Sequence, residues 1–130
     1  MERVVVFDVN ETLLDLTALD LHFERAFGDA GVRAECFATV RRNSMIAGIT
    51  ARYEDFSKIA GASLVMTAEA RHVDLRDEDR QSILAAVRSL PAAGDVVPGL
   101  QKLKTAEARM ITLTNSPPAV VEAELKNAAH

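Results

Sequence analysis

The chain has 130 residues, which is enough for one domain with a hydrophobic core. Hydrophobic residues make up 48% of it and charged residues 26%, a composition typical of globular proteins and not of disordered ones. A net charge of −4 with no basic cluster larger than Arg41-Arg42 argues against a nucleic-acid partner, and no apolar run is long enough to span a membrane.

The first predicted element is a strand, Val4 to Phe7, that runs directly into Asp8. Consecutive apolar and mostly β-branched residues predict a strand that is buried on both faces. Open α/β sheets bind ligands beyond the carboxyl ends of their strands, so Asp8 lies where chemistry is expected. Its carboxylate can act as a nucleophile toward carbon or phosphorus. The alternative interpretation is an ordinary turn after a strand.

Four helices are predicted next, because apolar residues recur at helical spacing over 16–27, 37–49, 53–64 and 83–90. Gly28 is predicted to end the first helix and Pro91 the last. The charged run 76–80 is predicted to be a solvated first turn, where acidic side chains suit the helix dipole. The segment 91–99 reads as a linker, followed by a short helix around Leu100 and Leu103.

The second predicted strand begins near Arg109 and ends in small hydroxyl and amide residues. Ser116 is predicted to cap the helix that follows, 119–129, with Pro117 or Pro118 in its first turn. Such a helix start presents free N–H groups to an anion.

These two strand ends resemble motifs one and two of the haloacid dehalogenase superfamily. Asp8, Asn10 and Thr12 occupy the positions of the Asp-x-Asp-x-Thr motif, and Thr114 and Asn115 those of the second motif. Phosphatases of the superfamily usually carry a second aspartate where this chain has Asn10, and that aspartate protonates the leaving group. Halide leaves without protonation, so the chain looks most like the type II, L-2-haloacid dehalogenase branch. The resemblance extends through 52–56 and covers nearly the whole chain.

The resemblance implies a Rossmann-like α/β core with a parallel sheet and an inserted helical cap. We expect the core to comprise 1–15 and 96–130 and the cap to comprise 16–95. Two strands cannot form a complete core, and family members continue with further strands that supply a third-motif lysine. We therefore expect this sequence to be an N-terminal fragment of a longer protein and to be inactive by itself.

The implied mechanism has two steps: Asp8 attacks the halogen-bearing carbon to give an ester, and water then hydrolyses that ester to a 2-hydroxy acid. Thr12, Thr114 and Asn115 would assist Asp8, and Asn10 would contact the substrate. The family uses an arginine of the cap for the substrate carboxylate. Arg42 fits that place and Arg41 competes for it, while Arg42 reaching only to solvent is the structural alternative.

The expected partner is a small haloacid, with neither metal nor cofactor, because halide is a good leaving group. The single cysteine, Cys36, and a strand too close to the N-terminus to leave room for a signal peptide predict a cytoplasmic protein. A homodimer is left open. Two other functions also remain open: a magnesium-dependent phosphatase that uses the same Asp8, and a non-catalytic fragment that only associates.

Overall fold

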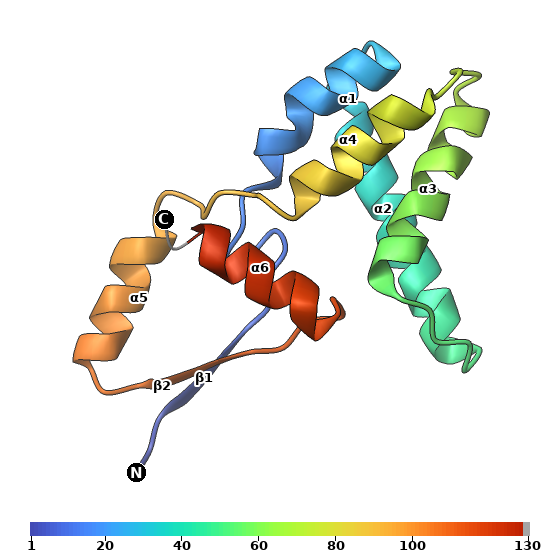
Figure 1. Ribbon diagram of the computed structural model, residues 1–130. Coiled ribbons are helices and arrows are strands. Elements are labelled where there is room, and N and C mark those ends of the chain that lie inside the picture. Colours follow the sequence, from blue (N-terminus) through green and yellow to red (C-terminus); the bar gives the residue numbers. More distant parts are fainter. Residues whose placement is uncertain (129–130) are drawn as a thin grey trace.

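Two parallel strands organise the computed structural model, which describes residues 1–128. Strand β1 (Val4–Phe7) pairs with β2 (Arg109–Thr112), and Phe7 lies opposite Thr112. Because both strands run in the same direction, their carboxyl ends meet at one edge of the sheet (Figure 1). Both predicted strands are therefore confirmed.

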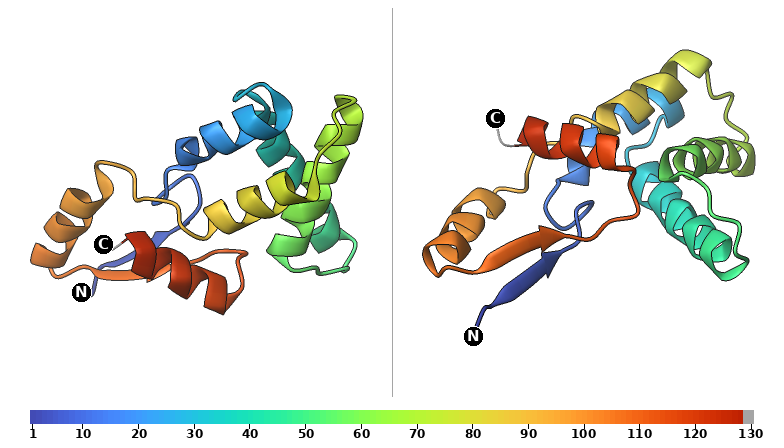
Figure 2. Two further views of the ribbon diagram at one scale, coloured as in Figure 1. Left: turned by 45° about the horizontal axis from the view of Figure 1, so that its top comes forward. Right: turned by 60° about the horizontal axis from the view of Figure 1, so that its bottom comes forward.

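The helices divide into two groups around this sheet. Helices α5 and α6 lie beside the strands, whereas the short 3-10 helix η1 and α1 to α4 gather beyond the carboxyl ends of the strands (Figures 1 and 2). Their bounds are η1 (Leu16–Leu19), α1 (Asp20–Phe27), α2 (Val32–Ile49), α3 (Phe56–Ala70), α4 (Asp77–Val87), α5 (Val96–Thr105) and α6 (Pro118–Ala128). The arrangement is a Rossmann-like fold with an inserted helical region and an incomplete core, as the sequence predicted.

Local residues explain where the helices begin and end. Gly28 ends α1 in the left-handed conformation, with φ of 74°, which a glycine adopts without steric cost. The carboxylate of Asp55 accepts the N–H of Ser57 at 2.8 Å and caps α3. This helix therefore begins at Phe56, three residues later than the predicted start near Tyr53.

The predicted linker 91–99 is too long, because α5 already begins at Val96. Pro98 lies in the first turn of α5, where the backbone N–H that proline lacks would have no helical partner. At the other end of the chain, α6 covers most of the predicted helix 119–129, and residue 129 lies outside the described residues.

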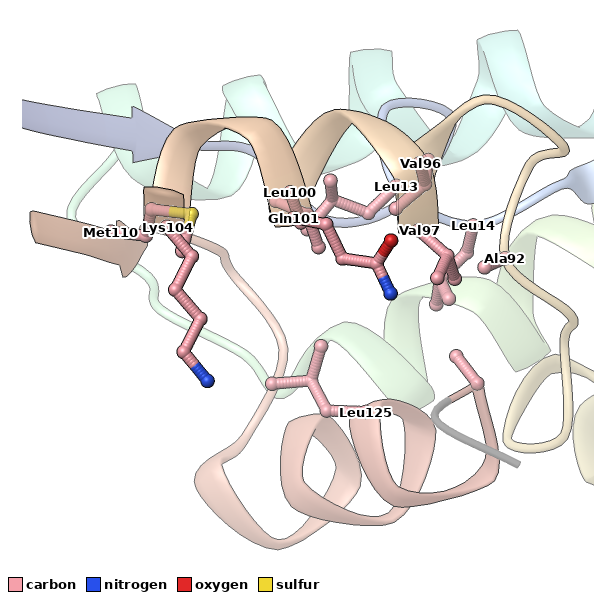
Figure 3. Close-up of a pocket in the computed structure, with 11 residues that line it drawn as sticks. Leu13, Leu14, Ala92, Val96, Val97, Leu100, Gln101, Lys104, Met110 and Leu125 are labelled. Atoms are coloured by element: carbon pink, nitrogen blue, oxygen red, sulfur yellow. The ribbon is translucent and has the colours of Figure 1, made fainter. Parts of the chain in front are cut away.

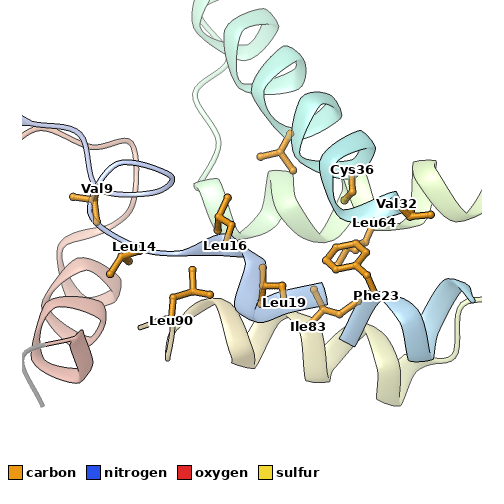
Figure 4. Close-up of a cluster of buried hydrophobic side chains, with 11 residues drawn as sticks. Val9, Leu14, Leu16, Leu19, Phe23, Val32, Cys36, Leu64, Ile83 and Leu90 are labelled. Atoms are coloured by element: carbon orange, nitrogen blue, oxygen red, sulfur yellow. The ribbon is translucent and has the colours of Figure 1, made fainter. Parts of the chain in front are cut away.

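The buried core lies mainly among the helices. It extends from Val9 and Leu14 in the loop after β1 to Phe23 of α1 and Leu64 of α3 (Figure 4). The prediction of a fully buried first strand is wrong for the described residues, since Val6 is 52% exposed. A sheet with only two strands in the described part of the chain leaves much of each strand in contact with solvent.

The two crossings between the sheet and the helical group lie side by side. The N–H of Asp15 donates to the carbonyl of Pro91 at 2.9 Å, and the N–H of Ala93 donates to the carbonyl of Leu13 at 3.0 Å. These bonds fix where the helical group joins the strands. Within residues 1–128, the helices include none with the length and apolar character needed to cross a membrane.

Candidate active site

The loop after β1 folds back on itself and places Thr12 beside Asp8. Val9 is completely buried, and its carbonyl accepts several N–H groups of the following turn, including that of Leu13 at 2.8 Å. Glu11 adopts a left-handed conformation with φ of 64°, which is uncommon for a residue with a side chain. Such backbone conformations occur often at functional sites.

The Asp8 carboxylate lies at the carboxyl end of β1 and is exposed to solvent. The hydroxyl of Thr12 donates a hydrogen bond to Asp8 Oδ2 over 3.2 Å. This contact orients the carboxylate while leaving the group accessible from solvent. An oriented, accessible carboxylate can act as a nucleophile. Across residues 1–128, no cluster of three or more His, Cys, Asp or Glu side chains could hold a metal ion.

The turn after β2 lies next to this loop. The N–H of Leu113 donates to the carbonyl of Phe7 at 2.8 Å, which continues the strand pairing. Beyond it, Asn10 Nδ2 donates to the hydroxyl of Ser116 at 3.4 Å, and the N–H of Ser116 donates to Thr114 Oγ1 at 3.2 Å. The structure therefore brings the predicted site residues Asp8, Asn10, Thr12, Thr114 and Asn115 to one end of the sheet.

Ser116 has a different position from the predicted one. Helix α6 begins at Pro118, so Ser116 precedes the residue that caps it, and its hydroxyl binds Asn10 instead. The prediction of a proline in the first turn is confirmed. The other polar atom of the Asn10 side chain, Oδ1, is buried without a hydrogen-bond partner among the described residues.

The two neighbouring arginines of α2 differ in their contacts. Arg41 Nη1 pairs with Glu11 Oε2 at 2.6 Å, which ties α2 to the loop that carries Asp8. Arg42 is exposed and forms no ion pair within residues 1–128. The contact with Glu11 therefore brings Arg41, the competing candidate, to the site.

A cavity of about 200 Å³ lies between the helical group and the turn after β2. Asn115, which follows β2, lines the cavity on the side of the sheet. The other lining residues come from α2, α3 and the segment between them: Ser44, Ala47, Gly48, Tyr53, Glu54, Phe56 and Ile59. The hydroxyl of Ser44 is buried without a partner in the described part of the chain. The sequence did not predict that Ala47, Gly48 and Ile59 line a cavity, because their small or apolar side chains carry no chemical signal.

A further cavity, of about 330 Å³, lies between α5 and α6 (Figure 3). Its walls are mainly apolar, with Leu13 from the loop after β1, Leu100 from α5 and Leu125 from α6. None of the predicted site residues lines it, so it is separate from the candidate site.

Comparison with known proteins relates this geometry to one group of enzymes. No protein-family model matches the chain. The (S)-2-haloacid dehalogenase 4A of Burkholderia cepacia is 26% identical over 129 residues, which are 95% of this chain and 54% of that protein.

Solved structures show the same similarity. The L-2-haloacid dehalogenase from Xanthobacter autotrophicus superimposes with a TM-score of 0.88 at 24% identity, over 99% of this chain and 53% of that one. A second structure of that enzyme, with chloropropionic acid covalently bound, gives a TM-score of 0.87 at 23% identity, over the same shares of the two chains. This chain thus spans about half the length of the proteins that it matches. Over that half, sequence and fold confirm the predicted resemblance to the L-2-haloacid dehalogenases of the haloacid dehalogenase superfamily.

Proposed function

We propose that this protein hydrolyses the carbon–halogen bond of short 2-haloacids. The observation that carries the proposal is the geometry of Asp8: an exposed carboxylate at the carboxyl end of β1, held by Thr12 at 3.2 Å, with the amide of Asn10 where a phosphatase would place its acid. The similarity to enzymes named as haloacid dehalogenases supports the same reaction.

In the first step an Asp8 carboxylate oxygen attacks the carbon that bears the halogen. A new carbon–oxygen bond forms on the face opposite the halogen, and the carbon–halogen bonding pair leaves as halide. The products are an aspartyl ester with inverted configuration and a free halide ion. Halide needs no proton to leave, so the amide of Asn10 suffices where a phosphoryl substrate would need an acid.

In the second step water attacks the carbonyl carbon of the Asp8 ester. The acyl–oxygen bond breaks, the substrate oxygen takes a proton and departs as the hydroxyl of a 2-hydroxy acid, and Asp8 regains its carboxylate. Backbone N–H groups after Asp8, together with Thr114 and Asn115, would bind the negative charge that develops on the ester oxygen. The proximity of the two strand ends supports these roles.

An arginine of α2 would bind the substrate carboxylate. A guanidinium can hold a carboxylate through two parallel hydrogen bonds, which fixes the orientation of the substrate. Arg42 is the sequence-based candidate, but the ion pair between Arg41 and Glu11 favours Arg41, because it brings that guanidinium to the loop that carries Asp8.

The cavity beside Asn115 would receive the body of the substrate. Its volume of about 200 Å³ suits a short 2-haloacid, and the Ser44 hydroxyl offers a hydrogen bond. This assignment implies that 16–95 acts as a cap over a core formed by 1–15 and 96–130. The paired backbone segments at Asp15 and Ala93 support that division.

We also propose that the protein is cytoplasmic and that it can form a homodimer. Cys36 is a free, buried thiol, which suits a reducing cytoplasm. Exposed apolar residues on the sheet, including Val4, Val6 and Ile111, are compatible with a homodimer.

The test is a single turnover in ¹⁸O-labelled water with L-2-chloropropionate, performed on the protein as its gene encodes it. Chloride release with label appearing in the Asp8 side chain is the expected result, because the second step puts a water oxygen into that carboxylate. Label that enters only the product would contradict an ester on Asp8. Phosphate-ester hydrolysis that depends on added magnesium would favour the phosphatase alternative.

A further inference from the structure

A separate cavity of about 160 Å³ lies between α3, α4 and α6. Its walls are largely apolar and include Phe56 of α3, Leu84 of α4 and Val120 of α6. Phe56 also lines the cavity beside Asn115, so the two spaces share this residue. The side-chain amide of Asn127 donates to the carbonyl of Ser89 at 2.9 Å, which fastens α6 to the end of α4 and keeps these walls together.

The unusual feature of this cavity is Glu124. It lies on the inward stripe of α6, where Val121 and Ala128 occupy the neighbouring turns, so the helical pattern assigns an apolar residue to its position. Glu124 is nevertheless fully buried, and neither carboxylate oxygen has a hydrogen-bond partner among the described residues. A buried polar group without a partner is costly, and a buried charge is more so. Burial raises the pKa of Glu124 to about 7.

A basic side chain also lines this cavity. Arg88, at the end of α4, lines the cavity and is exposed, whereas Glu124 lies buried. The two side chains form no ion pair with each other in the described part of the chain. The hydroxyls of Ser57 and Ser116 and the amide of Gln81 add hydrogen-bonding groups to the lining. The lining thus combines one acidic side chain, one basic side chain and mainly apolar walls.

We propose that this cavity binds an apolar amino acid as a zwitterion. The ammonium group donates to the Glu124 carboxylate, the carboxylate accepts from the Arg88 guanidinium, and the side chain packs against Phe56, Leu84 and Val120. A volume of about 160 Å³ is close to that of cavities that hold one benzene molecule, so only a small ligand fits. The inference uses none of the proposed catalytic residues, and the two cavities share one lining residue, Phe56.

L-valine, isovalerate and isobutylamine are the probes for a calorimetric titration of the purified protein. Isovalerate lacks the ammonium group of valine and isobutylamine lacks its carboxylate, so each probe tests one of the two proposed contacts. We expect saturable valine binding that weakens about tenfold or more in Glu124→Gln and in Arg88→Gln, since hydrogen bonds between charged groups are the strong ones. Isovalerate binding should fall in Arg88→Gln only, and isobutylamine binding in Glu124→Gln only.

Glu122→Gln is the matched control, because Glu122 lies exposed on the same helix. It should leave all three affinities unchanged. Absence of saturable valine binding, or equal valine affinity in Glu124→Gln and the parent, overturns the proposal. A measurement on the unmodified protein guards against a variant that fails to fold: NMR of the carboxyl carbon of Glu124 should show its pKa falling when valine is added, because an ammonium group stabilises the charged form. An unchanged pKa in saturating valine contradicts the proposed contact.

Discussion

The side-chain amide of Asn10 donates a hydrogen bond of 3.4 Å to the hydroxyl of Ser116, although the two residues are 106 positions apart. This contact joins the loop after β1 to the turn after β2, the two segments that carry the proposed catalytic groups. Asn10 Oδ1 is buried without a partner among the described residues. A carboxylate at this position would bring a charge into the same confined space, so the neutral amide fits its surroundings.

The first prediction concerns the proposed nucleophile. Asp8→Asn should reduce halide release by about a thousandfold or more, because an amide is a very poor nucleophile, and no ester should form on the protein. Halide release and the mass of the protein after a single turnover measure both effects. Asp74→Asn, an exposed aspartate far along the chain, is the control and should keep full activity. Equal activity in Asp8→Asn and the control would eliminate the mechanism.

The second prediction concerns Asn10 and metal ions. Asn10→Asp should not increase halide release, since halide needs no acid, and it should lower the midpoint of urea unfolding because it introduces a carboxylate beside Ser116. EDTA should leave the dehalogenase activity of the parent protein unchanged. Restoration of an EDTA-inhibited activity by magnesium would instead support the phosphatase alternative.

The third prediction separates the two arginines of α2. Arg41→Lys should raise the KM for haloacids about tenfold, because lysine cannot form the paired hydrogen bonds of a guanidinium. Arg42→Lys serves as the matched variant and should have a smaller effect, since only Arg41 is tied to Glu11 of the catalytic loop. The reverse order of effects would assign the substrate carboxylate to Arg42, as the sequence first indicated.

The sequence predicted most of the elements because their signals are local. Consecutive β-branched residues before Asp8 predicted β1, and Gly28 predicted the end of α1. The start of α3 was placed too early, since the pattern of apolar residues does not reveal that the Asp55 side chain caps the helix. The start of α5 was placed too late because Pro98 suggested a linker, although a proline is tolerated in a first turn.

The candidate site was harder to predict from the sequence, because it depends on contacts between segments that are distant in the chain. The choice between Arg41 and Arg42 requires the direction of each side chain from α2, which the helical period alone does not resolve. Ser44 and Ile59 line the cavity beside Asn115, but neither a serine nor an isoleucine in the sequence indicates a pocket. Glu124 belongs to no sequence motif, and only its burial on α6 in the structure distinguishes it from a surface glutamate.

The fourth prediction concerns association through the sheet. Val4 and Val6 lie on the same face of β1 and are about half exposed, and Ile111 beside Val6 on β2 is 41% exposed. Exposed apolar strands promote pairing with another chain. Size-exclusion chromatography of the 130-residue chain should therefore show oligomers that Val6→Lys shifts toward monomer. Leu21→Lys, at an exposed leucine of α1, should not shift them. A monomeric parent chain would contradict the prediction.

The fifth prediction follows from the burial of Glu124, whose pKa rises from 4.5 to about 7 on folding. Because the folded state holds this proton more tightly, the contribution of Glu124 to stability is fully present below pH 4.5 and is lost as the pH rises through about 7. Arg88 also lines this cavity, and within residues 1–128 it forms no ion pair with Glu124. Urea unfolding followed by circular dichroism should therefore show a free energy of unfolding that declines over this interval in the parent protein.

Glu124→Gln keeps the shape of the side chain and removes the ionisable group, so its free energy of unfolding should decline less over the same interval. Glu122→Gln is the control, and its free energy of unfolding should follow that of the parent. Parallel profiles for the parent and Glu124→Gln would mean that Glu124 does not titrate differently in the folded and unfolded states.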